Sequence, residues 1–449
     1  MQRRPSATTA TTDTHRLRTR PRLAAALAVA ILAGCGPSGA ALPGLVPGHT
    51  SAPVAAASAS PVPASAAALA MTPPPSTPPS PSPSPPPFAS PSSPPSALAY
   101  DPARFGFAAK GMSHEVMAFV TTSQVDYALA SMDWEVVSTV AFFSLEAGRG
   151  GHLRHDGRWK IWNSTRVDRM IALAHERGTK VVISLARFAW SPGQTAVARD
   201  ILASAANRAT LAREVAVEVD RRGVDGVNVD FEPIPLGQKA NFTDFVRLVR
   251  AELDRIRPGY QLTFDVTGHH DSYDVAGALR PGGADAVYLM GYHYAGTWSK
   301  VAGSTSPLGG PRYDLTDTVR GLLRYARPKQ LIVGVPYYGH TWPTASGRIH
   351  ARTVGRGHDV LYANAIRAAR RLGGGYDKVE QVRWVAFREG GQWYQMYFDD
   401  TRSMTAKWDL VMRHGLLGTG VWTIAFEGGA RELDSAMRRA FRSDPAPAP

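Results

Sequence analysis

Short apolar runs alternate with segments of helical periodicity from about residue 100 to near the C-terminus. Several runs are apolar at almost every position, as strands buried on both faces of a parallel sheet are. Between them, apolar spacing with terminal Gly or Pro predicts helices at 163–178, 195–222 (with a break near 207) and 238–256. Strands are predicted at 116–120, 136–143, 180–186, 224–231, 261–266, 286–291, 331–336 and 418–424.

Eight strands alternating with helices predict an α/β fold, the (β/α)8 TIM barrel. A doubly wound open sheet is the alternative, but the glycine-rich nucleotide turn that usually accompanies it is absent. The interval from 337 to about 417 is too long for one barrel helix, and Gly390-Gly391 between aromatic runs predicts a hairpin there. We therefore expect a small α+β insertion between strands seven and eight. The barrel is assigned to 100–443, and 444–449 is expected to be a disordered tail.

The N-terminal part has a different composition. Residues 36–99 are rich in Ala, Pro and Ser and carry no charged side chain, which predicts a disordered linker with polyproline II character. Ahead of them, four arginines precede the apolar run 23–33, which is too short to span a bilayer and is typical of a secretory signal.

The apolar run ends in Leu32-Ala33-Gly34-Cys35, which resembles a bacterial lipobox. The resemblance implies a lipoprotein signal peptide, 1–35, with lipid attached to the thiol of Cys35. The alternative is an ordinary signal peptide that contains a cysteine. We expect an extracytoplasmic protein of a bacterial cell envelope, anchored to the membrane by lipid, or else secreted.

Charge and cysteine content exclude several classes of protein. The formal net charge is +13, but the first 22 residues carry six Arg and one Asp, and the next charged residue is Asp101. The remaining +8 contains no Lys/Arg block of the kind that follows a phosphate backbone, so nucleic-acid binding is not expected. A single cysteine excludes an internal disulfide and a cysteine-based metal site. We expect a monomer without a cofactor.

The fourth predicted strand carries the candidate chemistry. Asn228, Asp230 and Glu232 alternate with apolar residues, so they share one face of the strand. Glu232 ends the strand just before Pro233, and active sites of TIM barrels lie at the C-terminal ends of the strands. Two carboxyl groups this close resist ionising together, which suits a general acid. A calcium loop is an alternative, but apolar residues stand where it needs polar ones. Structural carboxylates paired with barrel arginines are another.

The stretch from Asp225 to Glu232, DGVNVDFE, resembles the DxxDxDxE signature of glycoside hydrolase family 18, the chitinase-like family, with three of the four acidic positions matched. The segments DAVYLMGYHY, LIVGVPYYGHTW and GLLGTGVWTI are similar to the family's strands six, seven and eight. The resemblance covers roughly 110–440. It implies a retaining hydrolase of β-1,4-linked N-acetylglucosamine polymers.

The resemblance also implies roles for individual residues. Glu232 would protonate the glycosidic oxygen while the substrate's own acetamido carbonyl attacks, an exception to the usual pair of carboxylates. Asp230 would orient the acetamide and stabilise the oxazolinium intermediate, and Tyr292 would bind the acetamido oxygen. Trp422 would form the floor under the sugar, although a barrel-core aromatic is the alternative. Further substrate-binding or supporting residues would be Asp225, Asn228, Met290, His293, Arg187 and Tyr337.

Three positions depart from the family pattern. Asn228 replaces the middle Asp, removing a carboxylate that would share the proton of Asp230, and His293 replaces the Asp of MxYD. Arg187 lies where the family has SxGG, and either binds a substrate carboxylate or forms a salt bridge within the barrel. The pair His269 and His270 follows strand five, but no third ligand at metal-site spacing accompanies it, and no metal is expected.

Three functions remain in view. A hydrolase of chitin or of the peptidoglycan glycan is favoured by Glu232, since non-catalytic members of the family typically lose this residue. No chitin-binding module is visible. A lectin-like, non-catalytic sugar-binding barrel and a structural or adhesive lipoprotein with a vestigial site are the alternatives.

Overall fold

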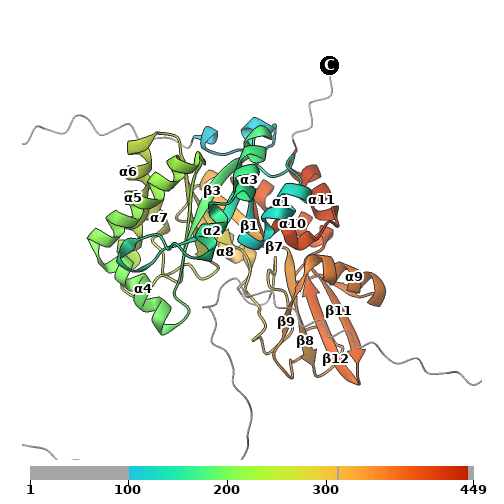
Figure 1. Ribbon diagram of the computed structural model, residues 1–449. Coiled ribbons are helices and arrows are strands. Elements are labelled where there is room, and N and C mark those ends of the chain that lie inside the picture. Colours follow the sequence, from blue (N-terminus) through green and yellow to red (C-terminus); the bar gives the residue numbers. More distant parts are fainter. Residues whose placement is uncertain (1–100, 311–312, 443–449) are drawn as a thin grey trace, which may run out of the picture. The chain divides into compact units, whose positions relative to one another are not determined.

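Eight parallel strands close into a barrel in the computed structural model, which describes residues 101–310 and 313–442 (Figure 1). Around the barrel, the strands follow the order β1-β13-β7-β6-β5-β4-β3-β2. The predicted (β/α)8 barrel is therefore confirmed. The predicted signal peptide with Cys35, the linker and the tail at 444–449 lie outside the described residues. The barrel strands are β1 (Glu115–Thr121), β2 (Thr139–Glu146), β3 (Lys180–Phe188), β4 (Gly226–Glu232), β5 (Gln261–Thr267), β6 (Ala286–Met290), β7 (Leu331–Pro336) and β13 (Gly418–Trp422).

Helices surround the barrel, and their ends follow the local sequence. The predicted helix 195–222 is two helices, α4 and α5, divided at Ser204, whose hydroxyl accepts from the backbone N–H of Asn207 and caps α5. Gly223 ends α5 in the left-handed conformation at φ 62°. The barrel helices are α1 (Val125–Ser131), α2 (Gly157–Trp162), α3 (Thr165–Glu176), α4 (Pro192–Ala203), α5 (Ala205–Arg222), α6 (Lys239–Ile256), α7 (Val275–Ala278), α8 (Leu315–Leu322), α10 (Thr401–Arg413) and α11 (Glu432–Phe441).

The barrel strands bury two separate sets of side chains. One set packs outward against the helices, and the other fills the interior. The ring of Tyr288 on β6 occupies so much of the interior that a Cβ at Gly334 or Gly420 would lie 2.4 or 2.2 Å from it. These two inward positions on β7 and β13 therefore require glycine.

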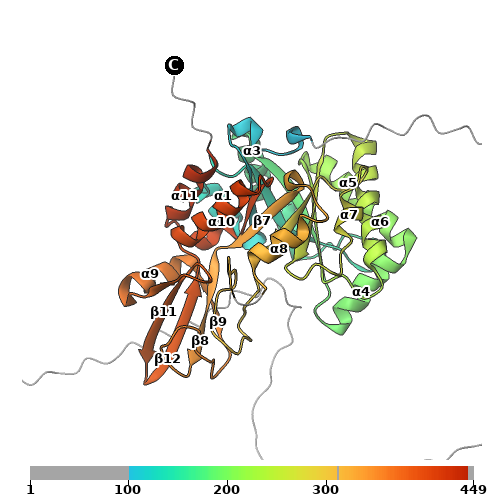
Figure 2. The same ribbon diagram turned by 180° about the vertical axis from the view of Figure 1, so that it is seen from behind.

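The insertion follows β7 directly and projects from the barrel, with α9 beside its sheet (Figures 1 and 2). It is a five-stranded antiparallel sheet in the order β10-β11-β12-β8-β9. The predicted hairpin is confirmed, since β11 and β12 join at Gly390 and Gly391, both with positive φ. The insertion comprises β8 (Tyr338–Thr344), β9 (His358–Leu361), α9 (Tyr362–Leu372), β10 (Gly375–Asp377), β11 (Val382–Glu389) and β12 (Gln392–Phe398).

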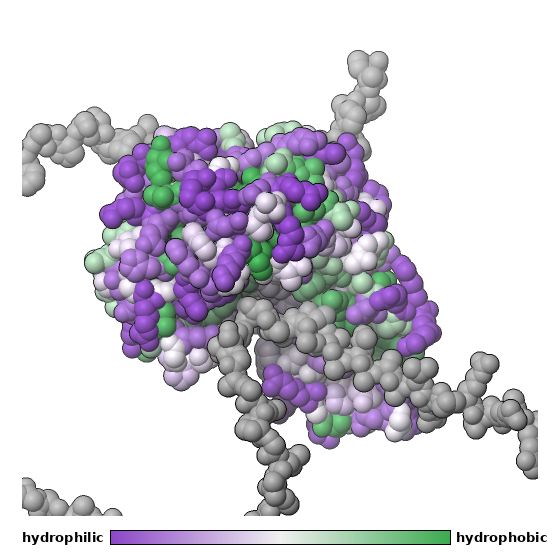
Figure 3. All heavy atoms as spheres, in the orientation of Figure 1, coloured by the Kyte–Doolittle hydropathy of each residue, from purple (hydrophilic) through white to green (hydrophobic). Residues whose placement is uncertain are grey.

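The surface of the described part is mixed in character. On the face shown in Figure 3, apolar side chains are scattered among polar ones. Within 101–310 and 313–442, no helix is both long and apolar enough to cross a membrane.

Candidate active site

Strand β4 points Asn228, Asp230 and Glu232 into the barrel, as its alternating pattern predicts. Glu232 is the last residue of the strand and is 9% exposed, so it reaches the carboxyl end of the barrel, whereas Asp230 is 2% exposed. The end of β4 is fixed on both sides. The N–H of Ala189 donates to the carbonyl oxygen of Glu232 at 2.6 Å, and the Tyr273 hydroxyl donates to that of Phe231 at 2.8 Å.

Asp230 has a strongly altered acidity. Burial raises the pKa of this carboxyl from its ordinary 3.8 to about 7, and a hydrogen bond from Glu232 acts in the opposite direction. A donor that lowers the pKa of Asp230 stabilises its ionised form, so the hydrogen bond places a proton between Glu232 and Asp230. The pair can thus present an acid at the carboxyl end of the barrel with an anion directly behind it.

A third carboxyl group, which the sequence analysis missed, lies in the same interior layer. Asp265 on β5 is 2% exposed, and its pKa is raised well above the usual range by burial and then by the charge of Asp230. The amide of Asn228 donates to Asp265 at 2.9 Å. The signal was present in the sequence, since β5 alternates polar and apolar residues as β4 does.

Tyr292, Met290 and Trp422 lie at the carboxyl ends of their strands, around the acids. Tyr292 follows β6 and is 6% exposed, and its pKa is raised by burial and by neighbouring groups that include Glu232. Trp422 ends β13 half-buried, with its ring 4.7 Å from that of Phe143 and perpendicular to it. Met290 packs inside the barrel with the same apolar cluster.

Tyr338, rather than Tyr337, belongs to this region, and the prediction for Tyr337 is wrong. Tyr337 is fully buried in the outer core, with its ring 6.3 Å from that of Tyr362. Tyr338 faces the other way, with ring centroids 6.3 Å from Tyr292 and 6.1 Å from His293. The inward residues of β7 are even-numbered, so strand alternation would have selected Tyr338.

His293 lies at the exposed rim beside Tyr292, in the left-handed backbone region at φ 68°. Its ring centroid is 5.3 Å from that of Tyr292 and 6.4 Å from that of Trp298, which is itself 62% exposed. The structure therefore brings His293 to the site, as an aromatic neighbour of Tyr292.

Asp225 lies at the opposite end of β4 from Glu232, and the prediction that it contacts substrate is wrong. Its carboxylate accepts from the Val181 N–H at 2.8 Å and contacts His175 Nε2 at 2.9 Å. The seven steps from Asp225 to Glu232 extend over about 23 Å at 3.3 Å per residue. Asp225 instead ties the start of β4 to β3 and α3.

Arg187 forms the predicted alternative, a salt bridge within the barrel wall. Its side chain is 5% exposed and points outward, where it pairs with Glu146 at 2.9 Å and donates to the Ala147 carbonyl at 2.9 Å. Glu146, at the end of β2, also binds Arg154 and Arg158. The assignment of Arg187 to substrate binding is therefore wrong.

One group of three candidate metal ligands occurs among the described residues, and it lies in and beside the insertion. The ligand atoms of His350, Asp377 and Glu380 are within 4.8 Å of one another. His350 Nε2 is 2.8 Å from Asp377 Oδ2, and Glu380 accepts from the Ser304 N–H at 2.7 Å. The contact of His350 with Asp377 is an ion pair within the fold, and the bond to Glu380 attaches the loop that carries Ser304. The histidines at 269 and 270 are not part of it.

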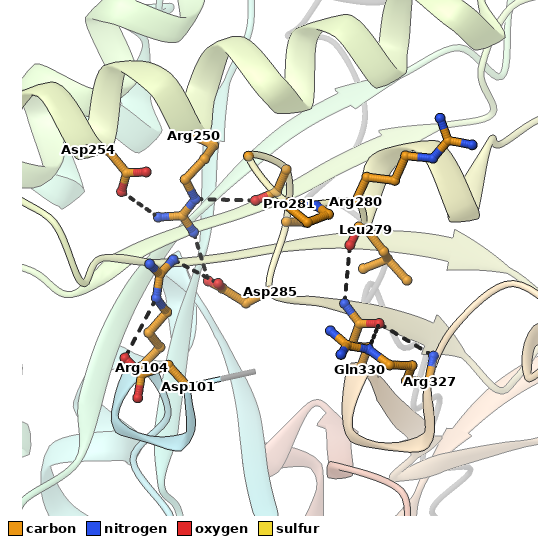
Figure 4. A pocket seen from close by; sticks show the side chains of 13 residues that line it. Asp101, Arg104, Arg250, Asp254, Leu279, Arg280, Pro281, Asp285, Arg327 and Gln330 are labelled. Atoms are coloured by element: carbon orange, nitrogen blue, oxygen red, sulfur yellow. Dashed lines mark hydrogen bonds and ion pairs between the residues drawn. The ribbon is translucent and has the colours of Figure 1, made fainter. Parts of the chain in front are cut away.

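A small pocket marks the amino-terminal end of the barrel, away from Glu232. Figure 4 shows Arg104 and Arg250 converging on Asp285, which precedes β6. Both distances are 2.8 Å. Arg250 also donates to the carbonyls of Gly283 and Tyr260, so its donors are used within the fold. We interpret this pocket as the closure of the barrel floor.

Comparisons with known proteins show which family the chain resembles. The family model described as glycosyl hydrolases family 18 matches residues 94–427. A Bacillus subtilis (strain 168) protein described as a sporulation-specific glycosylase is 26% identical over 52% of this chain and 56% of its own length. The di-N-acetylchitobiase of Rattus norvegicus is 24% identical over 70% of this chain and 84% of its own.

Solved structures share the fold. The Cycas revoluta chitinase in complex with (GlcNAc)4 superposes with a TM-score of 0.63 at 17% identity, over 73% of this chain and 98% of that one. The family match covers most of the chain, including every barrel strand up to β13. The chain therefore belongs to family 18 of the glycosyl hydrolases, and this membership classes it as a glycosidase.

Proposed function

We propose that the chain is a retaining hydrolase of β-1,4-linked N-acetylglucosamine polysaccharide that uses the substrate's acetamido group as nucleophile. The observation that carries the proposal is the pair Asp230 and Glu232 at the carboxyl end of β4. Glu232 is 9% exposed at the carboxyl end of the barrel and shares a hydrogen bond with a buried carboxyl, so it can keep a proton for the leaving oxygen.

Asp230 supplies the second half of the chemistry. It lies one inward position deeper than Glu232, and burial makes its charge costly unless a partner compensates it. An acetamido N–H that donates to Asp230 is such a partner, and the positive charge of an oxazolinium ion is a stronger one. The site thus stabilises the intermediate more than the ground state, as catalysis requires.

Aromatic side chains at the same end of the barrel suit a sugar chain. Trp422 is half-buried beside Phe143, and Trp190 and Trp298, in the loops after β3 and β6, are 63% and 62% exposed. Pyranose rings present apolar C–H faces that stack on aromatic rings. Exposed aromatics near a buried acid pair therefore favour a polymer of neutral sugars over a small charged ligand.

Glu232→Gln is the decisive variant, because it removes the proton donor and keeps the shape. The wild type should release reducing ends from chitin oligosaccharides or from peptidoglycan, and Glu232→Gln should release at least about 100-fold fewer. Equal release by both proteins, or none by the wild type, refutes the hydrolase and favours a sugar-binding barrel. Inhibition by a thiazoline analogue of the oxazolinium tests the nucleophile separately.

Digesting chitin and peptidoglycan side by side, with product masses, decides between the two polymers.

We also propose that the protein acts outside the cytoplasm of a bacterium, held on a membrane by lipid at Cys35. The sequence Leu32-Ala33-Gly34-Cys35 after a basic, then apolar segment supports this. The charge-free linker that follows would let the barrel search a polymer at a distance from the membrane.

A further inference from the structure

Asp265 lies beside Asp230 in the barrel interior, although it is outside the β4 motif. The ladder between β4 and β5 pairs Asn228 with Thr263 and Val229 with Phe264. One step further along both strands, Asp230 and Asp265 are level. Both side chains face inward, and both residues are 2% exposed. Adjacent strands are about 4.8 Å apart, so the two carboxyl groups are close neighbours.

Hydrogen bonds fix how Asp265 is held. The Thr263 hydroxyl donates to Asn228 Oδ1 at 2.7 Å, so the acceptor of this amide is already used. The amide nitrogen of Asn228 then donates to Asp265 Oδ2 at 2.9 Å. Asn228 thereby gives one of its two amide N–H donors to Asp265.

One oxygen of each acid remains unpaired. Among the described residues, Oδ1 of Asp230 and Oδ1 of Asp265 are buried and have no hydrogen-bond partner. Two ionised carboxylates in this arrangement would repel each other in a medium of low dielectric constant. A single proton between them converts the repulsion into a hydrogen bond.

We infer that Asp265 is a positioning residue of the glycosidase. It is protonated in the resting enzyme and donates a hydrogen bond to Asp230. From β5, Asp265 shares a proton with Asp230, as a carboxylate at position 228 would do from β4. The inference rests on the proposed function. Asp230 is then flanked by two donors, Glu232 toward the substrate and Asp265 below. The three acids together carry one negative charge, placed where the intermediate becomes positive.

The direction of the acidities agrees with this arrangement. Burial and the charge of Asp230 both raise the pKa of Asp265, so Asp265 keeps its proton when Asp230 ionises near pH 7. Tyr288 faces these acids from the interior, and Tyr273 lies behind β4 in the outer core. The pKa of each hydroxyl is raised by burial and by the acids' charges, so both stay neutral.

The test compares Asp265→Asn, which keeps an N–H donor toward Asp230, with Asp265→Leu, which has none. Loss of a hydrogen bond to a charged group should lower kcat of Asp265→Leu by about 10- to 100-fold, with a smaller effect on KM. Asp265→Asn should retain at least about tenfold more kcat than Asp265→Leu. Gln261→Leu, on the same face at the other end of β5, is the matched control and should leave kcat unchanged.

An exchange of the two positions provides a second test. Asn228→Asp alone adds a further buried acid and should lower kcat, whereas the double variant Asn228→Asp/Asp265→Asn should recover it at least about threefold. The inference is overturned if Asp265→Leu is as active as the wild type. It is also overturned if Asp265→Asn is as impaired as Asp265→Leu while both unfold cooperatively, or if the double variant recovers nothing.

Infrared difference spectroscopy separates this inference from the proposed function. At pH 7 the full-length wild type should show a protonated-carboxyl band that Asp265→Asn lacks, whether or not the enzyme acts on the polymers tried. Absence of that band refutes a protonated Asp265. An inactive wild type that shows the band refutes the proposed function alone.

Discussion

The buried charge of Asp230 predicts a measurable cost to the fold. The pKa of Asp230 is raised from 3.8 to about 7, and the side chain is 2% exposed, so solvent screens it little. A difference of about 3 in pKa corresponds to about 4 kcal/mol at 1.36 kcal/mol per unit. The proton on Asp230 stabilises the folded state fully below pH 4, and this stabilisation is lost as the pH rises through 7.

The variant Asp230→Asn removes this dependence, because the amide is neutral at every pH. The free energy of unfolding of the wild type should fall by up to about 4 kcal/mol between pH 4 and pH 8, relative to Asp230→Asn. Urea unfolding of both proteins at pH 5, 6, 7 and 8 measures the difference. Asp271→Asn, at an exposed carboxylate in the loop after β5, is the control for a change of charge alone.

The result that refutes the reasoning is a constant difference. If Asp230→Asn and the wild type differ in stability by the same amount at pH 5 and pH 8, Asp230 ionises in the fold as easily as in the unfolded chain. Burial would then not disfavour the negative charge on Asp230, and the argument that the substrate's positive charge compensates it would fail. A wild type that gains stability relative to Asp230→Asn as the pH rises refutes it equally.

Four further outcomes are expected. Since the substrate's acetamide needs an anionic partner, kcat/KM should rise between pH 5 and pH 7 as Asp230 ionises, and a flat profile contradicts this. Arg187→Ala should lower the free energy of unfolding by about 1.5 kcal/mol through the lost pair with Glu146, which keeps Arg154 and Arg158 as partners, with kcat unchanged for the folded enzyme. Trp422→Ala should lower kcat/KM by roughly 30-fold, or about 2 kcal/mol, and an unchanged value contradicts a role as sugar floor. Cys35→Ser should move the protein from the membrane to the soluble fraction, and equal partition of both proteins contradicts lipid anchoring.

Periodicity along the chain predicts most of the fold because the barrel repeats one local unit, a strand followed by a helix. All eight strands were predicted, since each is an apolar run whose length and punctuation are encoded within it. Their ends were less certain. The second predicted strand, 136–143, is observed as Thr139–Glu146. Glu146 has a polar side chain, and only its distant partners Arg154, Arg158 and Arg187 make its burial favourable.

The predictions of site residues were wrong where they relied on position in a family motif rather than on the direction of side chains along a strand. Arg187 and Tyr337 occupy motif segments, but alternation along β3 and β7 turns both side chains outward. Asp225 belongs to the signature, yet it lies at the other end of the strand. Asp265 was overlooked for the opposite reason, because it belongs to no motif. Alternation could have corrected these assignments, whereas the registers between strands were not readable from the sequence.

The relation of Asn228 to Asp265 follows from distances in a barrel interior. Residues i and i+2 of one strand are about 6.6 Å apart, whereas a residue level with them on the adjacent strand is about 4.8 Å away. The inward positions level with Asp230 are therefore on the adjacent strands, Ala186 on β3 and Asp265 on β5, and only Asp265 carries a carboxyl group. A carboxyl group at position 265 can therefore share a proton with Asp230 in place of one at position 228. Only the register of β4 with β5 reveals that the carboxyl group missing from the motif is still present beside Asp230.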